Sequence, residues 1–263
     1  MTQFNDLVLT MRTDWNRRAE LDAAHFICSE QGYQSLDDFF HSGERDVERY
    51  LVPHLRRLGL EPEMLRALDF GCGIGRLSAA LARRFRAVTA FDISAAMLAR
   101  GQALLAAADN ITWVQGNGFD LSNLADASHD VIFSYLTLQH VPDARLAMHY
   151  VAEMCRVLSP GGVMCVQFSY RPLYALRRWY VTLRSRLTRL RWLWRWLAPR
   201  RWRRRRYGRE EVMYMETLMQ HSLPPQSVTR LVRAQGLIVE MLDTTDPAYI
   251  WLVARKPAHA CAD

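Results

Sequence analysis

Cysteine and long apolar runs are scarce in this sequence, and each scarcity argues against a class of protein. No apolar run approaches the roughly 18 to 20 residues that a membrane-spanning helix needs. The first residues lack the basic and then apolar layout of a secretory signal peptide, so we expect none. The five cysteines are far apart and form no C-x-x-C pair, which argues against a disulfide framework and a cysteine zinc site. We therefore expect a reduced, cytoplasmic protein without a metal.

The composition is that of an ordinary globular protein. Apolar residues make up 50% and charged residues 23% of the 263 residues, which excludes wholesale disorder and a fibrous repeat. This length suits one large α/β domain or two small domains.

The positive charge is concentrated in one segment. Residues 171–209 contain 15 arginines and no acidic residue, whereas the whole chain has a net charge of +7, so the remainder carries −8. An acidic globular protein with one intensely basic segment needs two separate explanations.

Short apolar runs alternate with helical patterns from residue 65 onward. Strands are expected over residues 67–70, 87–91, 111–114, 131–133, 163–168, 237–242 and 249–254. Helices are expected between them over residues 77–85, 94–108, 144–158 and 227–235, with a turn at residues 159–162. Before residue 59 two helical stretches are expected, with a break between them at Ser42-Gly43. This alternation predicts an α/β fold with a doubly wound, mostly parallel, seven-stranded sheet. The link before the last strand is too short for a crossover helix, so the last two strands should be antiparallel neighbours.

A glycine-rich loop follows the first strand and opens a helix. Residues 68–75 have the spacing G-x-G-x-G, which differs from the G-x-G-x-x-G of dinucleotide-binding folds. Glycines there let the backbone turn tightly and let a ligand approach. Asp69 would repel a pyrophosphate but suits a cationic ligand, and Asp92 ends the second strand, where a carboxylate can hold both hydroxyls of a ribose. A glycine turn that only closes a βα unit is the plainer alternative.

The order of these motifs resembles that of the class I S-adenosylmethionine-dependent methyltransferases over residues 65–254. Residues 68–75 and 91–94 resemble the first two motifs, and residues 115–119, 130–141 and 158–162 resemble the later ones. The resemblance implies a Rossmann-like methyltransferase fold and S-adenosylmethionine as the cofactor. It also assigns contacts with the cofactor to Asp69, Gly71, Cys72, Gly73, Asp92, Ile93, Met97, Asn117, Gly118, Phe119, Ser134 and Tyr135.

Two of these positions have a particular role in the resemblance. Met97 falls where the family often has an apolar residue near the adenine. Asn117 stands where the family usually has aspartate, and its amide carbonyl can still accept a hydrogen bond from the adenine amino group.

His140 is the candidate general base. It lies just beyond the carboxyl end of the fourth strand, where ligands bind in open α/β sheets. A base is needed when the acceptor is a hydroxyl. The alternative is a structural histidine that holds the loop in place. Tyr135 and His25 are weaker candidates, and for both we favour packing roles.

Residues 15–24 resemble a helix that precedes this domain in some small-molecule and glycan methyltransferases. The resemblance implies that the helix closes over the cofactor, with Trp15 excluding water. Arg17 or Arg18 would then pair with the methionine carboxylate. A solvated amphipathic helix is the alternative.

The basic segment has an apolar stripe as well as its arginines. Apolar residues recur at four-then-three spacing from Leu176 to Leu197, which predicts one apolar face of a helix, and five of the eight tryptophans lie nearby. Arginines, tryptophans and an apolar stripe together are typical of a helix that lies on an anionic membrane. The stripe could instead pack on the domain as a substrate cap. Binding to nucleic acid is disfavoured because no RNA-binding module is found.

These patterns divide the chain into four parts. They are an N-terminal helical cover (1–64), a cofactor-binding core (65–170), a basic, aromatic-rich helical insertion (171–225) and the C-terminal part of the core sheet (226–263). The predicted function is methyl transfer to an oxygen of a small molecule, lipid or lipid-linked saccharide, by a cytoplasmic enzyme that is peripheral on the inner face of the membrane. RNA or protein methylation and a non-catalytic S-adenosylmethionine-binding scaffold are the alternatives.

Vesicle binding tests the membrane interpretation. Each arginine near an anionic surface contributes about 1 kcal/mol to the free energy of membrane binding, and salt screens this contribution. Burial of the apolar stripe adds a second contribution, which salt does not screen. Binding to anionic vesicles should therefore weaken but persist at high salt, and neutral vesicles should bind poorly. Replacing Leu183, Leu187 and Leu190 with serine should abolish the salt-resistant part. Unchanged vesicle binding, activity and melting temperature in that variant would contradict both the membrane and the cap interpretations.

Overall fold

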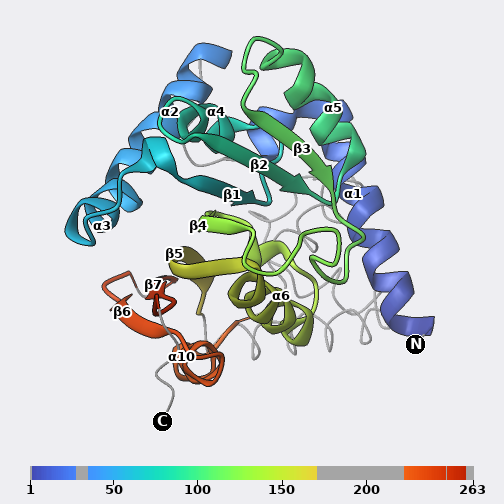
Figure 1. The fold of residues 1–263 in the computed structure, drawn as a ribbon. Coiled ribbons are helices and arrows are strands. Elements are labelled where there is room, and N and C mark those ends of the chain that lie inside the picture. The colour runs from blue at the N-terminus through green and yellow to red at the C-terminus, as the bar shows by residue number, and fades with distance from the viewer. Residues whose placement is uncertain (1, 28–34, 171–221, 247, 259–263) are drawn as a thin grey trace, which may run out of the picture.

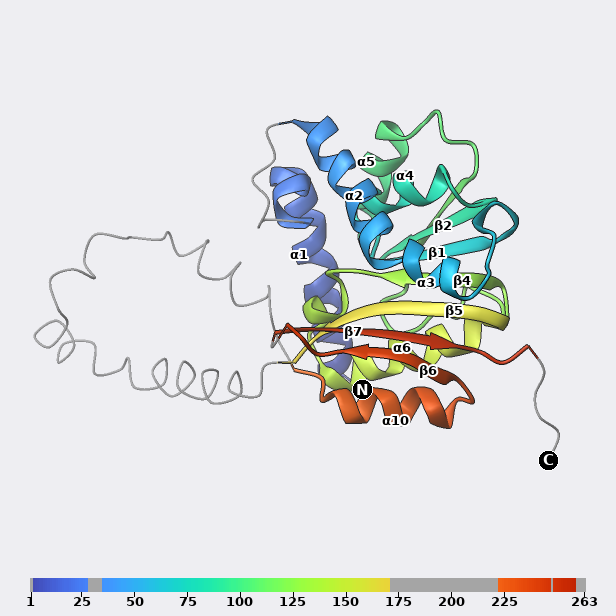
Figure 2. The same ribbon diagram turned by 90° about the vertical axis from the view of Figure 1, so that its left-hand side faces the viewer.

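Seven strands form one sheet with helices on both faces (Figure 1 and Figure 2). The computed structural model describes residues 2–27, 35–170, 222–246 and 248–258. The strand order is β3-β2-β1-β4-β5-β7-β6. The pairs from β3 across to β5 are parallel, while β7 is antiparallel to both of its neighbours. The predicted fold class and the antiparallel pairing of the last two strands are confirmed.

The strands are close to those predicted, and most extend by one or two residues. Their bounds are β1 (Arg66–Phe70), β2 (Ala87–Asp92), β3 (Ile111–Gln115), β4 (His129–Ser134), β5 (Leu158–Ser169), β6 (Ile238–Asp243) and β7 (Tyr249–Arg255). All residues of β5 from Val163 onward are buried, as expected of a central strand that is covered on both faces.

The helices cover the sheet in two groups (Figure 1). One face carries α2 (Leu36–Tyr50), α3 (Val52–Arg57), α4 (Arg76–Ala82) and α5 (Ala95–Leu104), and the other carries α6 (Ala144–Val157) and α10 (Pro225–Ala234). Two short 3-10 turns, η2 (Pro62–Met64) and η3 (Leu138–His140), complete the connections. Among the described elements, α1 (Thr2–Ile27) lies across the carboxyl ends of the strands instead of on a face of the sheet.

The helix α1 bends near its end. Asp22 has non-helical backbone angles, and its side chain accepts a hydrogen bond from the backbone N–H of His25. This side chain therefore caps a last short turn. The turn brings Ile27 against Gly73 of the glycine loop.

The predicted helix break at Ser42-Gly43 is wrong. Both residues are buried inside α2, where that helix crosses α4. A Cβ atom on Gly43 would collide with the backbone carbonyl of Arg76. The glycine therefore permits close approach of two helices and does not end one. The break comes at Leu51, just before Pro53, which fits the first turn of α3 but not the interior of a continuous helix.

The predicted turn at residues 159–162 is wrong as well. These residues belong to the start of β5, and Gly161 and Gly162 exchange backbone hydrogen bonds with Lys256. The positive φ of Gly161 and an irregularity in the β4–β5 register allow the strand to begin this early.

Most of the basic insertion, residues 171–221, lies outside the described residues, and with it the predicted apolar stripe. The described residues just before and just after this segment are in contact, since the backbone N–H of Leu223 donates to the carbonyl of Ser169 at 2.9 Å. No helix in the described part of the chain is both long and apolar enough to cross a membrane.

Candidate active site

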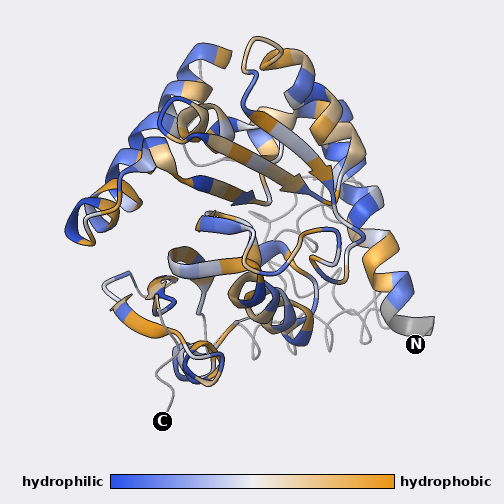
Figure 3. Cartoon of the chain, in the orientation of Figure 1, coloured by the Kyte–Doolittle hydropathy of each residue, from blue (hydrophilic) through white to orange (hydrophobic). Residues whose placement is uncertain are grey.

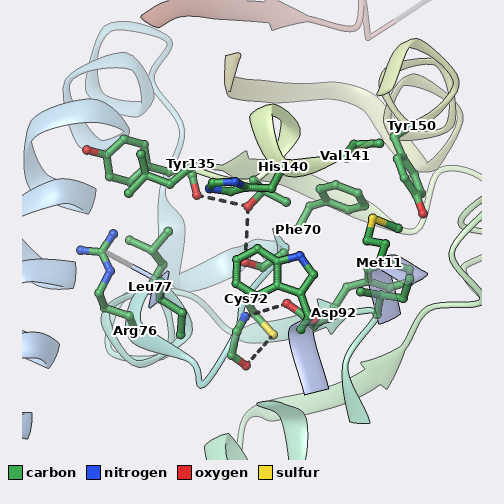
Figure 4. A pocket seen from close by; sticks show the side chains of 18 residues that line it. Met11, Phe70, Cys72, Arg76, Leu77, Asp92, Tyr135, His140, Val141 and Tyr150 are labelled. Carbon is green, nitrogen blue, oxygen red and sulfur yellow. Dashed lines mark hydrogen bonds between the residues drawn. The ribbon is translucent and has the colours of Figure 1, made fainter. Parts of the chain in front are cut away.

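A cavity of about 800 Å³, counting its open mouth, lies at the carboxyl ends of β1, β2 and β4 (Figure 4). The strand order reverses between β1 and β4, which is where open α/β sheets bind ligands. The glycine loop and the loops after β2 and β4 supply most of its wall, and α1 closes one side with Met11, Trp15 and Ile27.

The glycine loop needs glycine at two positions for steric reasons. Gly71 and Gly73 both have positive φ, at 79° and 56°. A Cβ atom on Gly71 would collide with Thr137, and one on Gly73 would collide with Ile27. The loop after β4 and the end of α1 thus approach the loop so closely that only glycine fits.

Asp92 lies in the cavity wall and holds the glycine loop. Its Oδ2 accepts the backbone N–H of Gly73 at 2.9 Å, and its Oδ1 accepts that of Ser94 at 2.8 Å. Burial raises the pKa of this carboxyl, although these backbone hydrogen bonds oppose the shift. Each carboxylate oxygen has two lone pairs, so each can still accept a hydroxyl of a ribose.

Asp69 lies beneath the loop and not in the cavity wall. It is fully buried, and the Ser78 hydroxyl of α4 donates to its Oδ2 at 2.6 Å. Burial raises the pKa of Asp69 to about 7, with the Ser78 hydrogen bond acting in the opposite direction. Its observed role is to join β1 to α4, whereas the sequence predicted contact with a cationic ligand.

Arg76 is a residue of the cavity wall that sequence reasoning missed. Its guanidinium is buried and forms an ion pair with Asp46 of α2 at 2.5 Å and a hydrogen bond to Ser42 at 3.0 Å. It also lies 5.6 Å from the ring of Tyr135. Its position directly after Gly75, at the start of a helix that opens on the cavity, was the available signal.

The helix α1 is held over the cavity by polar contacts with two loops and with α5. The side-chain carbonyl of Asn16 accepts the Ser94 hydroxyl at 2.7 Å. Arg12 donates to the backbone carbonyl of Asn117 at 2.6 Å, and Arg100 donates to that of Ala19. Trp15 then packs edge-on against His140, with ring centroids 5.4 Å apart. These contacts agree with the predicted cover.

The two arginines that the sequence placed near the methionine carboxylate do not line this cavity. Arg18 is 1% exposed, stacks 4.6 Å from the Trp15 ring and lines a second, smaller cavity. Among the described residues, Arg76 is the arginine that lines the large one.

The structure brings together about half of the predicted site residues. In the cavity wall lie Gly71, Cys72, Gly73, Asp92, Ile93, Tyr135 and His140. The wall does not include Asp69, Met97, Asn117, Gly118, Phe119 or Ser134.

The reasons for these exclusions are local. Met97 is fully buried in a cluster with Ala19 and Ala23 of α1, and the Ser134 hydroxyl donates to the backbone of Phe70. Gly118 packs against α1, and Phe119 is partly buried against the core. Their predicted contacts with the cofactor therefore stay predictions.

Several wall residues gave no usable sequence signal. They include Met11, Leu77, Thr137, Val141 and Tyr150. Met11 is the exception, because it stands one helical turn before Trp15 and so lies on the same face of the helix.

Asp92→Ala should weaken binding of S-adenosylhomocysteine by about 2 to 3 kcal/mol, because it removes charge-assisted hydrogen bonds to a ribose. In the wild type, affinity should fall as the pH is lowered through the raised pKa of Asp92, since the neutral acid accepts these bonds less well. Calorimetric titration measures both effects. Wild-type affinity in the variant would contradict the assignment of Asp92 to the ribose.

Known proteins are similar to this chain in sequence and in fold. A family described as "Methyltransferase domain" matches residues 68–166. An uncharacterized methyltransferase of Mycobacterium tuberculosis is 33% identical over 138 residues, which is 51% of this chain and 68% of that protein. A malonyl-[acyl-carrier protein] O-methyltransferase of Methylococcus capsulatus is 36% identical over 121 residues, 45% of this chain and 42% of that protein.

A solved structure has a similar fold. The magnesium protoporphyrin IX methyltransferase of Synechocystis with bound SAH has a TM-score of 0.60 at 17% identity and covers 95% of this chain and 99% of its own. The chain therefore belongs to the class I S-adenosylmethionine-dependent methyltransferases, and S-adenosylmethionine is its cofactor.

Proposed function

We propose that this methyltransferase acts on an oxygen atom of a small molecule, lipid or lipid-linked saccharide. The observation that carries the proposal is the position of His140. This residue lines the large cavity and also a second cavity of about 290 Å³.

The residues of the large cavity fit S-adenosylmethionine. The wall is mainly apolar, which suits the adenine ring and the aliphatic carbons of this ligand. Asp92 would hold the ribose, and the glycine loop leaves room for the ligand to approach the backbone. Cys72 is buried, and burial raises the pKa of its thiol, so it contributes an uncharged wall.

The second cavity offers the acceptor a way to the methyl group. It lies between α1 and the loop after β4, and it shares Met11, Trp15 and His140 with the large cavity. Arg18 and Asp14 supply polar groups in its wall. An acceptor in this cavity would meet the cofactor across the Trp15–His140 pair.

The chemistry needs positioning and, for a hydroxyl acceptor, a base. S-adenosylmethionine supplies a methyl carbon that is already electrophilic because it is bonded to a sulfonium. His140 would take the hydroxyl proton as the oxygen attacks. Trp15 would keep water away from the reacting atoms, and its contact with His140 would hold the imidazole in one orientation.

The relative from Methylococcus is named as an O-methyltransferase, which supports oxygen as the methylated atom. The present chain spans less than half of that protein, so its named substrate is not carried over.

The basic segment supports a location at an anionic membrane surface. Its arginines, tryptophans and apolar stripe come from residues 171–209, and the described chain on either side of the insertion meets at Ser169 and Leu223. Both of these residues lie at the carboxyl end of β5, the same edge of the sheet that holds the active site. A lipid or lipid-linked acceptor would then be reached from the surface that binds the enzyme.

Methyl-labelled S-adenosylmethionine tests the acceptor class. Incubation of the enzyme with fractionated lysate should place label in the small-molecule, lipid or glycan fraction. Label in RNA or protein would contradict the proposal. Absence of cofactor turnover with all fractions would favour a non-catalytic scaffold.

His140→Ala should lower turnover with a hydroxyl acceptor by about 10²- to 10⁴-fold and leave S-adenosylhomocysteine affinity unchanged. The exposed residue His41 offers a matched control, because it lies on α2 away from both cavities. His41→Ala should keep wild-type turnover. A loss below tenfold in His140→Ala would favour a structural role for this histidine.

A further inference from the structure

Tyr150 places a hydroxyl at one end of the cofactor cavity. The residue belongs to α6, is 3% exposed, and packs its ring against Phe70 with centroids 5.0 Å apart. It lines the cavity, and its hydroxyl end lies beside Met11 (Figure 4).

This hydroxyl has no hydrogen-bond partner among the described residues. Its pKa is raised above the usual value for tyrosine. Burial is the main cause, and no hydrogen bond contributes. Buried tyrosine hydroxyls usually have a partner, since an unsatisfied polar group loses its hydration without compensation. A polar group of a bound ligand would supply the missing partner.

The surroundings of the hydroxyl show which end of the cavity it occupies. It lies beside Met11 of α1, and the next residue of that helix, Arg12, donates to the backbone carbonyl of Asn117 in the loop after β3. Arg76 and Tyr135 lie at the opposite end (Figure 4). Since Asp92 is assigned to the ribose, the hydroxyl lies on the side of the β3 loop, where the base of the nucleoside would be.

Asn117, which was expected to bind the adenine base, uses its side-chain amide for hydrogen bonds within its own loop. The side-chain carbonyl of Asn117 accepts the backbone N–H groups of Phe119 at 2.7 Å and Asp120 at 3.0 Å. Its amide nitrogen donates to Asp120 at 2.6 Å and to Ser122 at 3.3 Å. A carbonyl oxygen has two lone pairs, and both are used within the loop.

We propose that the Tyr150 hydroxyl, and not the Asn117 side chain, accepts the hydrogen bond from the adenine amino group of S-adenosylmethionine. The hydroxyl oxygen can accept this hydrogen bond, and the apolar rings and aliphatic side chains around it exclude competing water. Asn117 instead holds the shape of the loop after β3, to which Arg12 of α1 is attached.

Calorimetric titration of the ligand-free enzyme with S-adenosylhomocysteine tests the role of the hydroxyl. Tyr150→Phe should bind about threefold to tenfold more weakly, the loss expected for one hydrogen bond. The melting temperature of the ligand-free variant should be unchanged or higher, because the change removes a hydroxyl without a partner. A merely structural hydroxyl would instead lower the melting temperature.

Tyr50→Phe is the matched control. Tyr50 is also part of an aromatic cluster, with its ring 4.4 Å from that of Trp251, but it does not line the cavity. Its affinity for S-adenosylhomocysteine should equal that of the wild type.

An analogue of S-adenosylhomocysteine with hydrogen in place of the adenine amino group tests the ligand atom. The wild type should lose affinity for this analogue, and Tyr150→Phe should lose several-fold less. Equal losses in the two proteins would overturn the assignment to the amino group. Wild-type affinity for S-adenosylhomocysteine in Tyr150→Phe, or a lower melting temperature without ligand, would overturn the proposal as a whole.

Discussion

The carboxylate of Asp92 connects the two loops on which the active site depends. Its two oxygens hold the backbone N–H groups of Gly73 and Ser94, so the loop after β1 and the loop after β2 cannot move independently. Ser94 in turn caps α5 and donates its hydroxyl to Asn16 of α1. One side chain thus fixes the cavity floor and, through its neighbour, the cover. We predict that the same carboxylate binds the ribose, which would couple loop geometry to cofactor binding.

The helix α1, which covers the cavity, is attached differently from the helices on the two faces of the sheet. The two faces of the sheet are covered by helices that bury continuous apolar cores. The helix α1 is attached through hydrogen bonds that involve Arg12, Asn16 and Arg100, through a small apolar cluster and through Val8, which belongs to one of these cores. Hydrogen bonds of this kind contribute about 0.5 to 1.5 kcal/mol each, so the cover can separate at much lower cost than the sheet can unfold. A cofactor enclosed by α1 can therefore exchange without disrupting the core.

The sequence predicted the sheet well because each parallel strand contains a short, mostly apolar run between helical patterns. It predicted Asp92 and the glycine loop because backbone geometry there demands particular residues. It could not predict contacts between distant segments. The ion pair of Arg76 and Asp46 joins residues that are 30 positions apart, and Gly43 is needed only because α4 crosses α2 at that point. The motif placed Asn117 in the loop after β3, where the structure has it. The direction of its side chain depends on hydrogen bonds to Asp120 and Ser122, and the motif does not specify these two residues.

The meeting of Ser169 and Leu223 has an evolutionary consequence. A backbone hydrogen bond joins the chain just before the insertion to the chain just after it, so the insertion begins and ends at neighbouring points beside β5. Closing a longer loop costs little, about 0.6 kcal/mol for each doubling of its length. Insertions at this point can therefore be lengthened, shortened or exchanged between related enzymes while the catalytic scaffold is retained. New acceptor preferences could arise by replacement of this one segment.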